Sequence, residues 1–313
     1  MLVAITSVIP TANRSQVLQR TLESIGRQEI QPAEIIVVDA SDNDSTKKIC
    51  CLSITGLESA IIYKKAQQKG AASQRHEGLD GNVNPVVFFL DDDIILEPGC
   101  IEALWNCIQS DNRIGAVNAM ITNQHYHTPG KITGFMYRLM SGKKMLSYAG
   151  KCIGPAWNLL PEDDPSLPAC TEVEWVNTTC TLYRMDSLPT PVFPERFKGY
   201  SLMEDLALSL TVAKKYKLYN VRNARIFHDS QPGEHKNNAT ALSKMELLNR
   251  HYIMTDIMGR NKFSDYCKLF IFELFGIFAG LRNKSGWRNL LPGILGKFMA
   301  AGKLVFTKNK YGQ

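Results

Sequence analysis

Residues 85–99 read PVVFFLDDDIILEPG and decide the fold. The apolar run Pro85–Leu90 ends in three adjacent carboxylates, and a helix-starting Pro-Gly pair follows. Burying charge is costly unless the charges are paired or bind a metal. Mg²⁺ is commonly held by one or two carboxylates together with phosphate oxygens. The stretch therefore predicts a buried strand whose carboxyl end holds a divalent cation against phosphate; the alternative is an acidic turn.

Apolar strands and helices alternate over residues 1–120. We expect strands at 2–9, 34–39, 60–64 and 85–90, and helices at 15–27, 45–52, 71–79 and 99–109. Continuous apolar strands separated by helices indicate a mostly parallel α/β sheet with helices on both faces. Ligands bind beyond the carboxyl ends of such strands. The segments 10–14, 39–44 and 91–93 should therefore converge.

The rest of the chain has weaker patterns. Residues 122–169 predict loops and short strands, 172–184 a strand pair, and 202–216 an amphipathic helix. Helical patterns follow at 242–258, 269–281 and 290–306. The intensely apolar stretch 269–281 is interrupted by Glu273 and is shorter than the roughly 20 residues of a membrane span.

The charge is concentrated at the C-terminal end. Residues 241–313 hold twelve Lys or Arg against four Asp or Glu, although the whole chain has a net charge of only +6. Basic amphipathic helices are typical of an anionic membrane surface; a buried helical subdomain or an oligomer interface is the alternative. Nucleic acid is disfavoured because these Lys and Arg residues are interleaved with long aliphatic side chains. A homo-oligomer remains open.

The cysteines and the first residues suggest a cellular location. The chain has eight cysteines but no C-x-x-C pair, which predicts reduced thiols rather than a zinc ribbon. Residues 1–10 have no basic stretch typical of a secretory signal. We therefore expect a cytoplasmic protein, peripheral at the inner face of the cell membrane.

Five segments in order resemble the family 2 glycosyltransferases, which are inverting enzymes with a GT-A fold. They are VIPTANR at 8–14, IIVVD with the following polar loop at 35–46, GAASQRHEGL at 70–79, FLDDD at 89–93, and the Glu204-Asp205 pair. Ala12 replaces an aromatic residue of the family pattern, and His76 replaces an asparagine. The resemblance covers roughly residues 3–260. It implies a GT-A domain over 1–240, with a nucleotide-binding half at 1–120 and a donor-sugar and acceptor half at 121–240. Residues 241–313 would be a basic helical region.

The resemblance also implies a donor site. Asp39 would accept hydrogen bonds from the base or the ribose, and the backbone at Pro10 and Thr11 would pack on the base. Arg14 and Arg75 would donate to the diphosphate, although each could instead be a surface charge. The remaining donor-binding candidates are Asn13, Asp42, Asp91, Asp92 and Asn177.

The metal would be Mn²⁺ or Mg²⁺ and would neutralise the diphosphate leaving group. Asp93 is the expected direct ligand, and Asp91 a ligand that acts directly or through ribose or water. His228 is a further candidate, with an ordinary loop histidine as the alternative. Asp92 should point the other way, because successive side chains alternate along an extended segment.

The resemblance assigns the general base to Asp205, with Glu204 as the second candidate. An inverting transfer needs a base that deprotonates the acceptor hydroxyl. Both carboxylates open a predicted helix, so favourable interaction with the helix dipole is the simpler alternative.

The expected function is metal-assisted transfer of a sugar from a nucleotide-diphosphate-sugar to a glycan or lipid-linked acceptor, in polysaccharide or cell-surface glycan synthesis. A non-catalytic nucleotide-sugar- or glycan-binding protein on the same fold is an alternative. A sugar nucleotidyltransferase is another, but a Gly-rich basic loop after the first strand is absent. The chain also lacks the G-x-G-x-x-G and P-loop motifs of dinucleotide and NTP sites.

Overall fold

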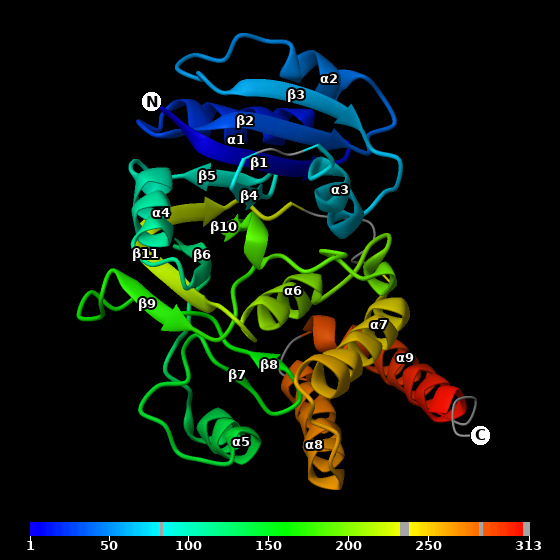
Figure 1. Ribbon diagram of the computed structural model, residues 1–313. Helices are drawn as coiled ribbons and strands as arrows, with labels where there is room; N and C mark the ends of the chain where they lie inside the picture. The colour runs from blue at the N-terminus through cyan, green and yellow to red at the C-terminus, as the bar shows by residue number, and fades with distance from the viewer. Residues whose placement is uncertain (82–83, 232–237, 282–283, 309–313) are drawn as a thin grey trace. The chain divides into compact units, whose positions relative to one another are not determined.

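The computed structural model describes residues 1–81, 84–231, 238–281 and 284–308 (Figure 1). The chain divides into two compact units. Unit 1 comprises residues 1–127, 149–151 and 159–231, and unit 2 comprises residues 128–148, 152–158 and 232–313.

Unit 1 is built on a nine-stranded sheet. Its strands are β1 (Leu2–Thr11), β2 (Gln31–Asp39), β3 (Ala60–Lys65), β4 (Val86–Leu90), β5 (Ile94–Leu96), β6 (Ile114–Ile121), β9 (Cys170–Val173), β10 (Cys180–Arg184) and β11 (Lys217–His228). The order is β3-β2-β1-β4-β10-β6-β11-β5, and β9 pairs with β11. β1–β4, β6 and β11 run in one direction, whereas β5, β9 and β10 run the opposite way. The predicted mostly parallel α/β sheet is confirmed.

The helices of unit 1 cover the sheet because its strands are apolar on both faces. These helices are α1 (Ser15–Gly26), α2 (Ser45–Cys50), α3 (Ala71–Gly78), α4 (Cys100–Gln109) and α6 (Glu204–Val212). On one face, alternate strand residues such as Ile9, Val37 and Phe88 join a core with Leu22 of α1 and Leu104 of α4. Every second strand residue points to one face, so the residues between them point to the other.

The second face of the sheet receives α3 at close range. A Cβ at Gly78 would collide with the side chain of Val8, so glycine allows this helix to lie against β1. The ring of Phe89 packs 5.7 Å from that of Tyr183 and 6.0 Å from that of Phe193. This packing holds the carboxyl end of β4, where the three carboxylates begin.

Three sequence predictions need correction. Residues 131–141, predicted as loop, form the helix α5 (Lys131–Ser141). The strands within 172–184 do not pair with each other, because β9 pairs with β11 whereas β10 lies between β4 and β6. The helix predicted over 202–216 is shorter and spans Glu204–Val212. The remaining helices and strands expected in residues 1–120 are confirmed within a few residues.

Unit 2 is mainly helical. It contains α5, the short strands β7 (Cys152–Ile153) and β8 (Trp157–Asn158), α7 (Ala239–Tyr252), a π-helical segment (Ile253–Ile257), α8 (Phe263–Gly280) and α9 (Lys284–Lys308). The Trp157 ring lies 4.8 Å from Tyr137 of α5 and 4.9 Å from Phe272 of α8, so an aromatic cluster joins these elements. Among the described residues, no helix is both long enough and apolar enough to cross a membrane.

Candidate active site

The three carboxylates form the connection between the sheet centre and its edge. β4 ends at Leu90, Asp91–Asp93 follow, and β5 begins at Ile94. β5 runs antiparallel to β11 with Ile94 opposite His228. The N–H of Asp229 donates to the Asp93 carbonyl at 2.9 Å. Strand pairing thus brings His228 beside Asp93 across a long stretch of sequence.

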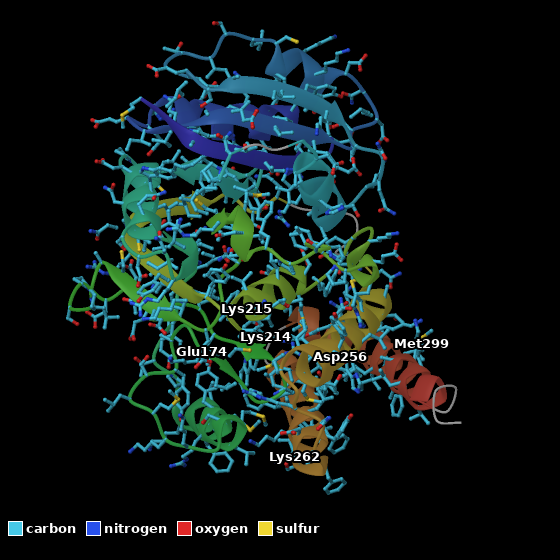
Figure 2. The ribbon with its side chains drawn as sticks, viewed as in Figure 1. Glu174, Lys214, Lys215, Asp256, Lys262 and Met299 are labelled. Atoms are coloured by element: carbon cyan, nitrogen blue, oxygen red, sulfur yellow. The ribbon has the colours of Figure 1, made fainter. Side chains whose placement is uncertain are left out.

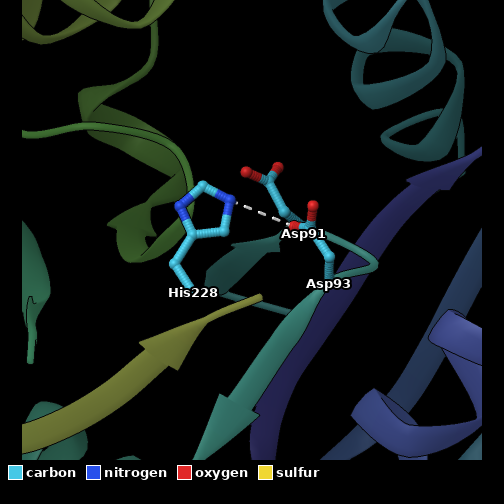
Figure 3. Close-up of side chains that lie close together, drawn as sticks. All are labelled: Asp91, Asp93 and His228. Atoms are coloured by element: carbon cyan, nitrogen blue, oxygen red, sulfur yellow. Dashed lines mark ion pairs between the residues drawn. The ribbon is translucent and has the colours of Figure 1, made fainter. Parts of the chain in front are cut away.

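Asp91, Asp93 and His228 form a cluster of metal-ligand type (Figure 3). One donor atom from each lies within 4.8 Å of the others. His228 Nε2 is 3.2 Å from Asp93 Oδ1, and the Gln231 N–H donates to Asp93 Oδ2 at 3.3 Å. Carboxylate oxygens suit Mg²⁺ and Mn²⁺, and imidazole adds a nitrogen ligand typical of transition metals. The donor set therefore fits a divalent cation.

The electrostatics of the two cluster carboxylates differ. Burial raises the pKa of Asp91, although the Arg75 charge opposes this. Burial alone would also raise the pKa of Asp93, but the hydrogen bonds from His228 and the Gln231 N–H, with the charge of Arg14, hold it below its ordinary value. Asp93 is therefore the carboxylate held ionised over the wider pH range, as a metal ligand must be.

Asp92 is turned away from this cluster. The Thr11 hydroxyl donates to Asp92 Oδ2 at 2.6 Å, and Arg14 Nη1 lies 3.3 Å from Oδ1. The Thr21 hydroxyl donates to the Asp92 carbonyl at 2.7 Å. Burial raises the pKa of Asp92 to about 6. Asp92 thus ties the carboxyl end of β4 to β1 and α1.

Arg75 connects the cluster to α6. Its side chain is only 3% exposed; Nη2 lies 2.5 Å from Asp91 Oδ1, and Nη1 lies 3.7 Å from Glu204 Oε1. Nε and Nη1 have no hydrogen-bond partner within the described part of the chain. Gly70 makes this position possible, since a Cβ there would collide with the backbone of Gly199. Arg75 is therefore a buried cation with donors to spare.

Glu204 and Asp205 open α6 side by side. The Leu206 N–H donates to Asp205 Oδ1 at 2.7 Å. Burial, followed by the charge of Asp205, raises the pKa of Glu204 to about 7. Burial also raises the pKa of Asp205. Two adjacent carboxylates with raised pKa values can take up a proton near neutral pH, which suits acid–base chemistry.

The loops after β1 and β2 are joined by two residues. Asn13, in the left-handed region at φ 57°, donates from Nδ2 to Asp42 Oδ2 at 3.0 Å, and the Asp42 N–H donates back to Asn13 Oδ1 at 3.0 Å. Lys69 Nζ lies 2.8 Å from Asp42 Oδ1. Pro10 is buried just before this pair of loops. The predicted convergence of segments 10–14, 39–44 and 91–93 is confirmed through Asn13 and Asp92.

Asp39 occupies a more enclosed place than its expected role suggests. Its side chain is fully buried, and its oxygens accept hydrogen bonds from the Ser41 N–H and hydroxyl and from the Tyr63 hydroxyl. In this conformation Asp39 shapes the loop after β2. Its binding of a nucleotide stays a prediction.

Asn177 lies one step from the cluster. Its Oδ1 accepts from the Thr179 N–H at 3.1 Å, and the Thr179 carbonyl accepts from the Asp91 N–H at 2.9 Å. It therefore supports the backbone of Asp91.

Two residues at the site were not predicted from the sequence. Gln74, next to Arg75, is buried and donates to the carbonyls of Thr11 and Val38 at 2.9 and 2.7 Å, which locks the ends of β1 and β2 together. Tyr183 is a fully buried strand residue whose hydroxyl has no partner among the described atoms. Burial and the nearby charge of Asp205 raise its pKa. Gln74 falls inside the GAASQRHEGL segment, but Tyr183 carries no local signal.

Known proteins resemble part of the chain. Glycosyltransferase GlyA of Streptococcus pneumoniae is 29% identical over 114 residues, 36% of this chain and 16% of that protein. The GalNAc(5)-diNAcBac-PP-undecaprenol beta-1,3-glucosyltransferase of Campylobacter jejuni is 32% identical over 99 residues, 31% of this chain and 32% of that protein. The chain thus covers at most 32% of the length of these two relatives.

A solved structure extends the likeness of fold. The mannosyltransferase PcManGT of Pyrobaculum calidifontis, in complex with GDP-Man and Mn²⁺, matches 98% of this chain and 80% of its own chain, with a TM-score of 0.53 and 14% identity. This match confirms the predicted glycosyltransferase-type α/β fold. The family model described as Glycosyl transferase family 2 matches residues 6–154. Over these residues, which carry four of the five motif segments, the chain is similar to glycosyl transferase family 2.

Proposed function

We propose that the protein is an inverting glycosyltransferase that moves a sugar from a nucleotide-diphosphate-sugar to a glycan or lipid-linked acceptor. The observation that carries this proposal is the continuous chain of charged groups from Asp93 and Asp91 through Arg75 to Glu204. It joins a candidate metal site to a pair of carboxylates with raised pKa values within one unit. Metal-assisted transfer to an acceptor hydroxyl needs a site for the cation and a carboxylate that can accept the proton of the hydroxyl.

Asp91, Asp93 and His228 would hold the cation. We favour Mn²⁺ over Mg²⁺ because Mg²⁺ is usually bound by carboxylates and phosphate oxygens, whereas the third donor here is an imidazole nitrogen. The structural neighbour solved with GDP-Man and Mn²⁺ supports this choice. When bound, the cation supplies charge neutralisation for the leaving diphosphate.

Arg75 and Arg14 would bind the diphosphate together with the cation. Nε and Nη1 of Arg75 are buried donors without a hydrogen-bond acceptor among the described residues, and a charge-assisted bond to a phosphate oxygen would satisfy them. Arg14 lies 3.6 Å from Asp93 Oδ2 and is partly exposed. The nucleotide would lie along the loops that carry Pro10, Thr11 and Asn13.

The remaining donor-binding roles follow the same loops. Asp39 and Asp42 would bind the nucleoside, which requires the enclosed Asp39 carboxylate to exchange its present partners. Asp92 and Asn177 would support the site through the backbone next to Asp91.

Asp205 would act as the general base. It would take the proton of the acceptor hydroxyl as that oxygen bonds to the anomeric carbon and the bond from this carbon to the phosphate oxygen breaks. Attack opposite the leaving group inverts the configuration. Glu204 already pairs with Arg75. We therefore assign Glu204 to orienting the acceptor and to sharing with Asp205 the proton taken from the acceptor hydroxyl.

The acceptor and location are also proposals. The Campylobacter relative is named for an undecaprenol-linked acceptor, which supports a lipid-linked or cell-surface glycan for this chain at the inner face of the cell membrane. In this view residues 1–240 are catalytic and residues 241–313 serve another purpose.

A donor screen followed by transfer tests the proposal. Thermal unfolding with Mn²⁺ across a panel of UDP-, GDP- and dTDP-sugars should identify one donor that raises the melting temperature. The radiolabelled form of that donor should then label glycan or lipid extract in the presence of the wild-type protein. Donor binding with no labelling of any extract, and no hydrolysis, would instead support a non-catalytic binding protein.

A further inference from the structure

Glu273, the single acidic residue in the apolar stretch of α8, points toward the interior of unit 2. Glu273 is buried and pairs with Lys297 of α9, while its Oε1 lies 3.5 Å from Arg250 Nε of α7. Leu269, one helical turn earlier, is buried in the same direction. The negative charge that interrupts the apolar sequence is therefore neutralised inside unit 2.

The inward side of α9 is equally well defined. Gly296 and Ala300, one turn apart, are buried. A Cβ at Gly296 would collide with the Thr240 carbonyl of α7, so α9 packs against α7 on this side. The opposite sides of α8 and α9 must then face away from the helix contacts.

Those opposite sides carry large apolar side chains at helical spacing. On α8 they are Phe270, Leu274 and Phe278, and on α9 they are Trp287, Leu291, Leu295 and Phe298. Phe270, Leu291 and Phe298 are 65%, 76% and 73% exposed. Single exposed apolar residues are normal, but a row that recurs every three or four residues along one side of a helix marks an interaction surface. We call these seven residues the outer face. Figure 2 labels two other residues of these helices, Lys262 just before α8 and Met299 on α9.

Basic residues adjoin the outer face. Lys284 and Arg288 are exposed one turn apart at the start of α9, next to Trp287. The sequence has no acidic residue after Glu273. The outer face therefore combines apolar side chains with neighbouring positive charges. It complements a partner that is apolar in its interior and anionic at its surface. A lipid bilayer with anionic headgroups has that chemistry.

We propose that the outer face of α8 and α9 docks on an anionic lipid bilayer, with its apolar side chains among the acyl chains and Lys284 and Arg288 at the headgroups. This inference goes beyond the proposed function, because lipid binding of this kind needs neither donor nor turnover. It can therefore fail or succeed independently of glycosyl transfer.

Vesicle binding with a fluorescence readout tests the proposal. Trp287 is 63% exposed, so vesicles of phosphatidylglycerol and phosphatidylcholine should shift its emission to the blue, and brominated acyl chains should quench it. Vesicles of phosphatidylcholine alone should bind much more weakly. Trp287→Phe should sediment with vesicles but lose the lipid-dependent change in emission.

Two pairs of substitutions separate the apolar and electrostatic contributions. Leu291→Ser with Phe298→Ser should weaken vesicle binding by at least about tenfold. Lys284→Ser with Arg288→Ser should weaken it by about fivefold for each charge removed. Matched controls in unit 1, Lys214→Ser with Lys215→Ser and exposed Leu52→Ser, should bind as the wild type does (Figure 2 labels Lys214 and Lys215).

Three results would overturn the proposal. The first is equal binding to anionic and neutral vesicles, and the second is equal loss in the controls. The third is a lipid-free dimer that already buries Trp287 and that Phe298→Ser dissociates, since the outer face would then bind a second copy. Circular dichroism of each variant would verify that the helices remain folded.

Discussion

Arg75 Nη2 lies 2.5 Å from Asp91 Oδ1, and the same guanidinium lies near the Glu204 carboxylate. A residue of α3 thus holds together the carboxyl end of β4 and the start of α6. Arg75 compensates the charges of two buried acids at once. The same ion pairs therefore contribute to the stability of the fold and position Arg75 for the proposed binding of the diphosphate.

Replacing Arg75 should destabilise the fold strongly. Arg75→Met leaves Asp91 and Glu204 without a cation, and removal of one partner from a buried ion pair costs about 3–5 kcal/mol. Arg113→Met is the matched control, because Arg113 is 74% exposed and pairs with Asp111 at the surface, where such a pair contributes little to stability. Urea unfolding of both variants measures the difference. Equal losses would show that Arg75 does not compensate buried charge.

Substitutions of Asp93 and Asp92 should have different effects on the affinity for Mn²⁺. Asp93→Asn removes a cluster ligand and should weaken Mn²⁺ binding by at least about tenfold, the scale of even indirect changes at metal sites. Asp92→Asn should leave Mn²⁺ affinity close to that of the wild type, because Asp92 faces Thr11 and Arg14 rather than the cluster. Titration of free Mn²⁺ by electron paramagnetic resonance measures both variants. Stronger loss in the Asp92 variant would reverse the assignment.

Glu204 should make stability depend on pH. Its pKa is raised to about 7 in the folded protein, so the folded state favours the neutral acid. The contribution of neutral Glu204 to the free energy of unfolding is fully present below the pKa that Glu204 has in the unfolded chain. This contribution is lost as pH rises through about 7. Glu204→Gln should therefore be more stable than the wild type by on the order of 3 kcal/mol at pH 8 and equally stable at pH 4.

Chemical unfolding in EDTA across this pH range measures the effect of Glu204. Exposed Glu29→Gln is the control and should follow the wild type at every pH. If the Glu204 variant gains stability equally at pH 4 and pH 8, ionisation of Glu204 is not the cause.

Asp205 should matter for the rate and not for donor binding. Asp205→Asn keeps the hydrogen bond from the Leu206 N–H but cannot accept the acceptor proton, so kcat should fall by about 10²–10⁴. The Kd of the donor in the presence of Mn²⁺ should stay near the wild-type value. Steady-state transfer and calorimetry give the two numbers. Unchanged kcat would exclude Asp205, and a larger loss in Glu204→Gln would move the base to Glu204.

Local pattern was sufficient where the strands are apolar and end in polar residues. The convergence of Asn13, Asp42 and Asp92 follows from the rule that parallel strands share one carboxyl edge. α5 also had a local signal, with Ile132, Phe135 and Leu139 at helical spacing. The Gly and Pro residues around it masked that signal.

Contacts between residues that are far apart in the sequence could not be predicted from local pattern. Asp93 meets His228 only because β5 reverses and pairs with β11. Asp39 is enclosed by Tyr63 of the neighbouring strand. Glu273 looks like an interruption in sequence, but Lys297 on another helix pairs with it. Each partner lies far along the chain, so periodicity alone does not reveal it.

The central claim is metal-assisted cleavage of a nucleotide-sugar at the Asp91, Asp93 and His228 cluster. The most direct measurement is the rate of nucleoside diphosphate release from the donor that the screen identifies, with acceptor extract, in Mn²⁺ and again in EDTA. We predict release in Mn²⁺, loss of release in EDTA, and recovery when Mn²⁺ is restored. The same rate in EDTA as in Mn²⁺ would contradict the claim.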